Sequence, residues 1–285
     1  MKIYISQKAR ENTCGGGWTF TKNFIKALKD KIEFVDKLEE CDILFIPGPT
    51  LEERKTLETA KSLGKKIVFR IDNLPRNSKN RNTGTSRLYD FSQLADVIVY
   101  QSEWARKTIM PFVKKDGVVI LNGADDSIFK KNGNVIKKNG SPQYLYIRSS
   151  RDELKRWEKA WYDFMEIYFQ NPGVHLWIAG NFSSENVEYN FDLYGGAERR
   201  YKYWGMIEDR GFLATLFRSA DTLLLPYYHD CCSNIAIEAR QCGIKIVYDE
   251  QEGGGTKEIM KADIEELTLR GIGEKYLLVF QKLYA

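Results

Sequence analysis

Short apolar runs alternate with longer amphipathic stretches along the chain. In the first half, the apolar runs are rich in β-branched residues and bounded by Gly, Pro, Asn or Asp, which predicts buried strands. These runs are Ile3–Ser6, Ile43–Pro47, Lys66–Ile71, Val97–Gln101 and Val118–Leu121. The intervening stretches with a helical pattern are Phe20–Asp30, Thr50–Leu63 and Glu103–Phe112. Repeated strand–helix–strand units with apolar strands predict a parallel sheet covered by helices on both faces.

The alternation pauses at Lys130–Pro142, a polar stretch rich in Gly and Asn that is typical of a linker. It then resumes with four predicted strands: Tyr144–Ile147, Val174–Ala179, Thr222–Pro226 and Lys245–Tyr248. The predicted helices are Glu153–Phe169, Gly211–Arg218 and Asn234–Cys242, with further helical segments from Thr256 onward. We therefore expect two α/β domains, an N-terminal one over residues 1–135 and a C-terminal one over residues 136–285. The last helix is free to pack back onto the N-terminal domain.

Composition narrows the classes of protein. The chain has 285 residues, of which 43% are hydrophobic and 29% charged, and these values exclude intrinsic disorder. No apolar run approaches the ~18 residues of a membrane span, and without a strongly basic amphipathic helix, attachment to a membrane surface has no support. The five cysteines are an odd number and Cys231 and Cys232 are adjacent, which favours free thiols in a reducing compartment. We therefore expect a cytoplasmic protein.

The net charge of +4 is unevenly distributed. Residues 1–140 contain 26 Lys+Arg and 17 Asp+Glu, a net of +9, and the remainder has a net of −5. The split indicates either two units with different tasks or unselected surface variation. Nucleic acid is not an expected partner, because the basic residues are dispersed and no zinc or RNA-recognition signature accompanies them.

Ligands of parallel sheets bind at the carboxyl ends of strands, so the loops after strands are candidate sites. The first such loop contains Gly15–Gly17 directly before a helix, where backbone N–H groups can approach an anion; the alternative is a flexible turn. The second begins at Asp72, after the strand Lys66–Ile71. Asp72 can orient a hydroxyl group or accept a proton, or it caps the next segment.

The third loop follows the first strand of the second half and contains Arg148, Arg151 and Lys155. Arginine makes bidentate contacts with phosphate and lysine acts as a point charge, so this cluster could neutralise a diphosphate. The alternative is a solvated helix start with Asp152 and Glu153 as its N-terminal charges.

The fourth loop, Pro226–Gly243, joins a strand to a helix that ends in a glycine C-cap. Asp230 and Glu238 are eight positions apart, one in the loop before the helix and the other on its second turn. Ser233 and Asn234 are residues typical of an N-cap, so backbone N–H groups here would face a bound phosphate. A carboxylate such as Glu238 can accept two hydroxyl hydrogen bonds, which suits a ribose diol.

The same loop also contains His229, Cys231 and Cys232. No second Cys pair or His stands at metal-ligand spacing, and the only other histidine is His175, so we do not expect a zinc site. A cysteine-based hydrolase cannot be argued from the sequence order of Cys and His.

In this order, the four loops resemble a retaining glycosyltransferase of family 4. The most specific match is Asp230–Val247, which is similar to the family's motif of a carboxylate, seven residues and Glu, followed by Ala and Cys-Gly. Glu252–Glu258, Ala95–Ser102 and Asn122–Phe129 are also typical of the family, and the resemblance covers nearly the whole chain. Two features depart from it: Asp230 stands where the family normally has Glu, and the chain is short.

The resemblance implies the GT-B fold, in which two Rossmann-like, doubly wound parallel-sheet domains face a central cleft. It also implies transfer of a sugar, with retention, from a nucleotide-diphosphate sugar to a hydroxyl of a glycan or glycoconjugate. UDP or GDP is the expected nucleotide, and no metal or other cofactor is expected. The implied donor-binding residues are Gly16, Gly17, Arg148, Arg151, Lys155, Asp230, Ser233, Asn234, Ile235 and Glu238.

The resemblance assigns a role to each of these groups. Glu238 would hold the ribose, Asp230 would contact hydroxyls of the transferred sugar, and Asp72 would orient the acceptor. Arg148 or Arg151, with Lys155, would stabilise the departing diphosphate. The catalytic candidates are therefore Asp72 and Asp230.

Three other functions compete with this one. A nucleotide-sugar epimerase shares the fold and the donor site. A non-catalytic nucleotide-sugar-binding protein would fit Asp230 and the short chain. An NAD-dependent dehydrogenase is opposed by the absence of the dinucleotide glycine spacing after Ile3–Ser6.

Overall fold

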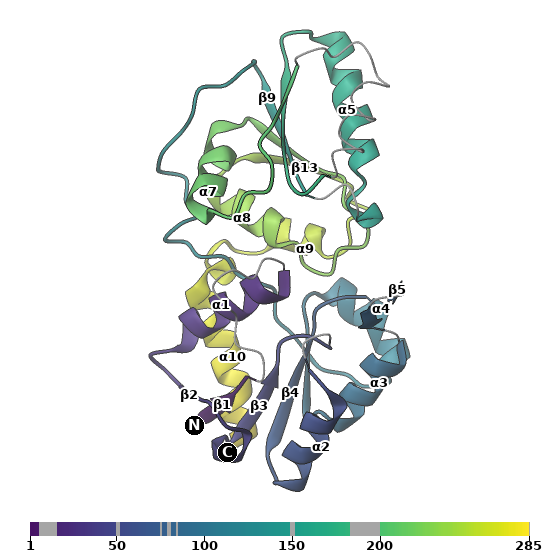
Figure 1. Cartoon of the computed structure of the whole chain (residues 1–285), viewed down its shortest axis with the longest axis vertical. Helices are drawn as coiled ribbons and strands as arrows, with labels where there is room; N and C mark the ends of the chain where they lie inside the picture. Colours follow the sequence, from purple (N-terminus) through teal and green to yellow (C-terminus); the bar gives the residue numbers. More distant parts are fainter. Residues whose placement is uncertain are drawn as a thin grey trace. The chain divides into compact units, whose positions relative to one another are not determined.

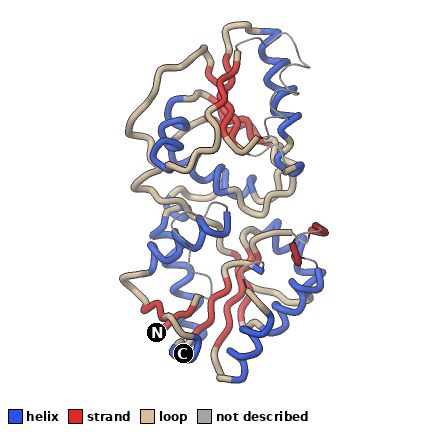
Figure 2. Tube along the Cα trace, viewed as in Figure 1, coloured by secondary structure: helices blue, strands red, loops and turns tan. Residues whose placement is uncertain are grey.

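The computed structural model of the chain describes residues 1–5, 16–49, 52–74, 76–78, 81–83, 85–148, 152–182 and 200–284. The chain divides into two units: the first unit comprises residues 1–124 and 261–285, and the second comprises residues 125–260 (Figure 1). In each unit the strands form a central layer with helices beside it (Figure 2).

The first unit is built on a six-stranded sheet with the order β2-β1-β3-β4-β7-β8, in which every pairing is parallel. Its strands are β1 (Lys2–Tyr4), β2 (Glu33–Val35), β3 (Ile43–Ile46), β4 (Lys66–Ile71), β7 (Val97–Tyr100) and β8 (Val118–Val119). Its helices are α1 (Gly16–Leu28), α2 (Arg54–Ser62), α3 (Thr85–Leu94), α4 (Glu103–Val113) and α10 (Leu269–Tyr284). The described part of this unit also contains the 3₁₀ turns η1 (Leu38–Glu40) and η4 (Glu265–Leu267) and an antiparallel pair, β5 (Arg76–Ser78) and β6 (Arg81–Thr83).

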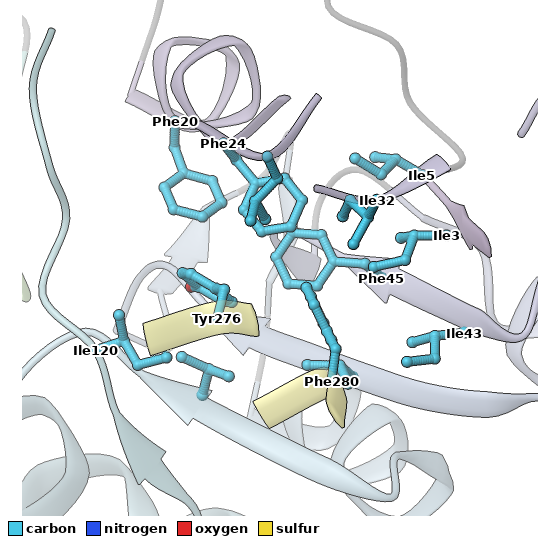
Figure 3. Packing of buried hydrophobic residues seen from close by; sticks show 13 residues of the cluster. Ile3, Ile5, Phe20, Phe24, Ile32, Ile43, Phe45, Ile120, Tyr276 and Phe280 are labelled. Atoms are coloured by element: carbon cyan, nitrogen blue, oxygen red, sulfur yellow. The ribbon is translucent and has the colours of Figure 1, made fainter. Parts of the chain in front are cut away.

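Aromatic side chains from both ends of the chain form the core of the first unit. Phe24 of α1 stacks on Phe45 of β3 with ring centroids 4.3 Å apart, and α10 contributes Tyr276 and Phe280 to the same cluster (Figure 3). Tyr276 meets Phe24 edge to face at 5.0 Å. Because these aromatic rings are fully buried, the C-terminal helix is part of the core of this unit.

The second unit is built on a five-stranded parallel sheet with the order β11-β10-β9-β12-β13. Its strands are β9 (Gln143–Ile147), β10 (His175–Ala179), β11 (Tyr201–Tyr203), β12 (Thr222–Leu225) and β13 (Lys245–Tyr248). Its helices are α5 (Trp157–Gln170), α7 (Arg210–Ser219), α8 (Asn234–Cys242) and α9 (Thr256–Lys261), with a 3₁₀ turn η3 (Glu153–Lys155) before α5. The chain adds β10 and β11 on one side of β9 and then crosses to add β12 and β13 on the other.

The polar stretch Lys130–Pro142 lies within the second unit and follows the boundary between the units at 124/125. Hydrogen bonds attach it to neighbouring elements. The Ile136 N–H donates to Ser219 Oγ at 2.8 Å, and the indole N–H of Trp177 donates to Asn139 Oδ1 at 2.7 Å. This stretch is therefore a loop that hydrogen bonds hold against the second unit.

Several predicted elements are confirmed with the same bounds, including the strands Lys66–Ile71 and Lys245–Tyr248 and the helix Asn234–Cys242. The C-cap of that helix is Gly243, with a φ of 81°, as the sequence predicts. Lys66–Ile71 is buried along almost its whole length and Asn234–Cys242 has a residue at each end that caps it, so for these two elements the local pattern and the tertiary environment agree.

The prediction of one continuous helix over Glu153–Phe169 is wrong. Arg156 adopts a left-handed backbone conformation with a φ of 49°, which ends the 3₁₀ turn η3 and starts α5 separately at Trp157. The residues predicted as a polar loop over Arg76–Arg87 contain β5, β6 and the beginning of α3. The short strands β2 and β11 escape prediction because each has only three residues and mixes charged or polar positions with apolar ones.

Within the described part of the chain, no helix has the length and apolar character needed to cross a membrane.

Candidate functional site

The candidate site lies where the strand order of the second sheet reverses, between β9 and β12. Arg148 follows β9 directly, and the loop Pro226–Ser233 joins β12 to α8. In doubly wound sheets, the crevice for a ligand forms outside the carboxyl ends of the strands at this switch point. The topology therefore brings the third and fourth loops of the sequence analysis to one edge of one sheet.

Backbone hydrogen bonds join three loops at this edge. The Tyr228 N–H donates to the Leu154 carbonyl at 2.7 Å, the His229 N–H to the Glu252 carbonyl at 2.8 Å, and the Gly255 N–H to the Asp230 carbonyl at 2.8 Å. Gly254 has a φ of 66°, and a Cβ added there would lie 2.5 Å from the Asp230 carbonyl oxygen. This position therefore requires glycine.

Asp230 forms a buried ion pair with Lys155. The Lys155 ammonium lies 2.5 Å from Asp230 Oδ2, and the two side chains are 8% and 12% exposed. The Cys232 N–H donates to the other carboxylate oxygen at 3.1 Å. Lys155 also lies 4.3 Å from the centre of the Tyr227 ring, so its charge is stabilised by a carboxylate and an aromatic face.

The charge state of Asp230 follows from these contacts. Burial opposes ionisation, but Lys155, the nearby Arg148 and the Cys232 N–H together hold the pKa of Asp230 below its usual range. The carboxylate is therefore ionised at neutral pH. It can accept hydrogen bonds from hydroxyl groups but has no proton to donate as a general acid.

The N-terminus of α8 is capped by Ser233, whose hydroxyl accepts a hydrogen bond from the Ala236 N–H at 3.3 Å. The cap uses this hydroxyl only as an acceptor, so its O–H can still donate to an anion, together with the backbone of the first helical turn. Asn234 and Ile235 form that turn. The N–H groups of a helix's first turn do not bond within the helix, and the helix dipole favours negative charge there.

Glu238 lies on the second turn of α8 with only 1% of its side chain exposed. Its Oε1 accepts a hydrogen bond from the guanidinium of Arg210, the first residue of α7. Its Oε2 is also buried and has no hydrogen-bond partner among the described residues. Burial raises the pKa of Glu238, and the positive charges of Arg210 and Arg148 oppose this effect.

Arg148 acts on both carboxylates, because its charge lowers the pKa of Asp230 and of Glu238. Its Nε is buried and has no hydrogen-bond partner in the described part of the chain. A pocket of about 330 Å³ also lies at these loops, lined by Glu153, Arg156, Tyr228 and Glu252. Arg156 and Glu252 form an ion pair of 3.0 Å in its wall.

The structure brings most of the predicted residues together in the second unit: Arg148, Lys155, Asp230, Ser233, Asn234, Ile235 and Glu238. Gly16, Gly17 and Asp72 lie in the first unit. Gly16 and Gly17 begin α1, and Asp72 follows β4, where its carboxylate packs so closely on Gly48 that a Cβ at residue 48 would lie 2.7 Å from it. Arg151 lies outside the described residues.

Sequence reasoning missed two residues of this site, Arg210 and Tyr227. Arg210 is 28 positions from Glu238 and belongs to a different helix, so no local spacing connects the two. Tyr227 lies three positions before Asp230 and has a buried ring, and its hydroxyl donates to the Ile147 carbonyl. Its place at the carboxyl end of a predicted strand was the one signal that could have found it.

No protein-family model and no curated protein matches the chain. Solved structures do resemble it. Anabaena HepE in complex with UDP and glucose has a TM-score of 0.66 at 12% identity, covering 98% of this chain and 99% of that one. Sucrose-phosphate synthase from Thermosynechococcus elongatus has a TM-score of 0.69 at 14% identity, covering 99% and 98%. The pneumococcal O-GlcNAc transferase GtfA in complex with UDP and GlcNAc has a TM-score of 0.62 at 13% identity, covering 95% and 61%.

These three neighbours are glycosyltransferases of the GT-B fold. Together with the two parallel sheets of six and five strands, they show that this chain also has the GT-B fold. The predicted fold class is thereby confirmed. At such low identity the likeness extends to the fold alone, so activity must be argued from the site.

Proposed function

We propose that the chain is a retaining glycosyltransferase of family 4 that transfers a hexose from a nucleotide-diphosphate sugar to a hydroxyl of a glycan or glycoconjugate. The observation that carries this proposal is the switch point of the second unit. There the sheet places a helix N-terminus, the Lys155–Asp230 pair and Glu238 at the carboxyl ends of β9 and β12. UDP or GDP is the proposed nucleotide, and the UDP bound to HepE and to GtfA supports a uridine donor.

In this proposal the diphosphate binds at the first turn of α8. Backbone N–H groups, the helix dipole and the charges of Lys155 and Arg148 stabilise it, with Arg151 as a further candidate. Because the negative charge on the leaving group grows as the glycosidic bond breaks, these groups act most strongly in the transition state. Ribose hydroxyls bind to Glu238, and Asp230 accepts hydrogen bonds from hydroxyls of the transferred sugar.

The lowered pKa of Asp230 makes its carboxylate a weak base, so the acceptor's proton needs another destination. We assign it to an oxygen of the departing diphosphate. The bond between the anomeric carbon and the phosphate oxygen breaks while the acceptor oxygen bonds to the same face of the sugar, which retains its configuration. Asp72 orients the acceptor hydroxyl, and Gly16 and Gly17 contact the donor. The reaction proposed here uses no metal and takes place in the cytoplasm.

The test is a transfer assay with UDP-, GDP- and ADP-hexoses and a panel of glycan acceptors. Released nucleotide diphosphate is quantified, and the configuration of the new linkage is read by NMR. We expect transfer with retention, and loss of most activity in Lys155→Ala and in Glu238→Ala with the fold intact. Lys159→Ala is the matched control, because Lys159 forms a partly exposed pair with Asp163 on α5.

Three results would contradict the proposal: no binding or turnover of any of these donors, an inverted linkage, or loss of activity on metal removal. Release of nucleotide diphosphate without transfer to any acceptor would favour the epimerase.

A further inference from the structure

The guanidinium of Arg210 bridges two parts of the second unit. Arg210 is the first residue of α7, directly after the N-cap Asp209, whose carboxylate accepts a hydrogen bond from the Gly211 N–H at 2.8 Å. Its head lies over the Phe129 ring at 4.9 Å and donates to Glu238 Oε1. The cap and the ring therefore fix the base and the head of a side chain that is 35% exposed.

The partner of Arg210 is in an unusual state for a buried carboxylate. Glu238 is 1% exposed, and only one of its two oxygens has a hydrogen-bond partner among the described residues. A buried polar atom without a partner is destabilising, and native structures keep few of them unless they have a function. Oε2 is therefore an acceptor ready for a hydroxyl group from a ligand.

Such an acceptor is strong only while the carboxylate is ionised. Four groups from four segments interact with its charge: Arg210 of α7, Arg148 after β9, Tyr227 after β12 and Cys242 of α8. Among the described residues, Arg210 is the one of the four that donates a hydrogen bond to Glu238, and its charge opposes the effect of burial more than that of Arg148 does. Removing Arg210 would leave burial to raise the pKa of Glu238 further.

We propose that Arg210 is a positioning residue for nucleotide recognition, which binds Glu238 Oε1 and so leaves Oε2 to accept a ribose hydroxyl. The inference rests on the proposed function. It also changes the expected contact between Glu238 and the ribose. Because Oε1 already accepts a hydrogen bond from Arg210, the hydroxyls of the diol bind to Oε2.

The test is calorimetric binding of UDP, GDP and ADP, followed by the 2′,3′-dideoxy analogue of whichever binds best. The proteins are the full chain and its variants Arg210→Met, Arg210→Lys, Glu238→Gln and the Arg210→Met/Glu238→Gln double variant, with Lys159→Ala as control. Each is measured between pH 6 and 9, and thermal unfolding reports whether the fold is kept.

We expect Arg210→Met to weaken binding of the ribonucleotide by about tenfold to a hundredfold at neutral pH, the range of a hydrogen bond to a charged group. The loss should shrink as pH rises and Glu238 ionises, and it should be small for the dideoxy analogue. Arg210→Lys should recover much of the affinity. In the Glu238→Gln background, Arg210→Met should have no further effect, because its action passes through the carboxylate.

The outcomes separate the inference from the proposed function. If the unmutated chain binds none of the three nucleotides, the proposed function fails and the inference with it. If the chain binds a nucleotide and Glu238→Gln weakens it, but Arg210→Met binds as well as the unmutated chain or more tightly, the inference alone is overturned. A loss in Arg210→Met that is independent of pH and equal for the dideoxy analogue would show a merely structural role and would also overturn it.

Discussion

The two units stabilise a buried cation in opposite ways. In the first unit, Arg70 is 1% exposed and donates to two neutral oxygens, the Pro47 carbonyl at 2.6 Å and Asn122 Oδ1 at 2.8 Å, while its head lies 3.6 Å from the centre of the Phe20 ring. In the second unit, the Lys155 side chain is 8% exposed and its partner is a carboxylate, Asp230.

The difference separates a structural contact from a candidate site. The hydrogen bonds of Arg70 connect the carboxyl ends of β3, β4 and β8. The Asn122 side-chain amide in turn donates to Gln101 Oε1, after β7, at 2.9 Å. These bonds hold loops of the first sheet together. In the second unit, each buried carboxylate at the switch point has its own cation. Paired charges beside a helix N-terminus are suited to binding an anion and hydroxyl groups, whereas neutral oxygens around an arginine are suited to holding loops.

The largest expected effect is from breaking the ion pair in the second unit. Lys155→Met leaves Asp230 as a buried charge on which, among the described cations, the charge of Arg148 still acts, and breaking a buried pair on one side costs about 3–5 kcal/mol. We expect urea unfolding to show a loss in this range. Lys159→Met should change the free energy of unfolding by less than about 0.5 kcal/mol, since its pair with Asp163 is partly exposed. Equal effects of the two substitutions would refute the buried pair.

Breaking the arginine contacts of the first unit should cost less. Arg70→Met removes the donor to the Pro47 carbonyl and Asn122 Oδ1. We expect urea unfolding to show a loss of about 1–3 kcal/mol in the free energy of unfolding. Arg70→Lys should recover little of this, because an ammonium lacks the fork that reaches both oxygens. Full recovery by lysine would show that charge alone, and not the fork, stabilises these loops.

The two carboxylates of the second unit should respond oppositely to pH. The pKa of Asp230 is lowered by folding, so its contribution to stability is present above its usual value and is lost as pH falls through the lowered value. The pKa of Glu238 is raised, so its contribution is present at low pH and is lost as pH rises through the raised value. Compared with the unmutated chain, Asp230→Asn should lose less thermal stability as the pH falls into the acid range. Glu238→Gln should lose less thermal stability as the pH rises from acid towards neutral. If both substitutions altered the pH dependence of thermal stability in the same direction, these assignments would be contradicted.

The smallest expected effect concerns two left-handed residues. Lys114, the C-cap of α4 in the first unit, has a φ of 54°, and Lys114→Gly should raise the free energy of unfolding by about 0.5–1 kcal/mol. Arg156→Gly relieves the same strain in the second unit but also removes the pair with Glu252, so its gain should be smaller. Thermal unfolding measures both, and a larger gain at residue 156 would show that the pair adds nothing.

The sequence predicts most of the sheet strands and the helix α8, because continuous apolar runs and capping residues are local features. It does not predict the break at Arg156, where a left-handed arginine has no local signature and depends on contacts with Tyr228 and Glu252. The partners within the site also escape it. Lys155 and Asp230 are 75 positions apart and Arg210 and Glu238 are 28 apart, so only the order of the strands brings them together. Sequence reasoning thus finds site residues one loop at a time, and the fold decides which of them are paired.

A crystal structure of the chain with UDP tests the central claim most directly. We predict diphosphate oxygens within hydrogen-bonding distance of the first-turn N–H groups of α8 and of the Lys155 ammonium, with a ribose hydroxyl on Glu238 Oε2. UDP bound elsewhere in the chain, or a diphosphate without contact to α8 and Lys155, would contradict it.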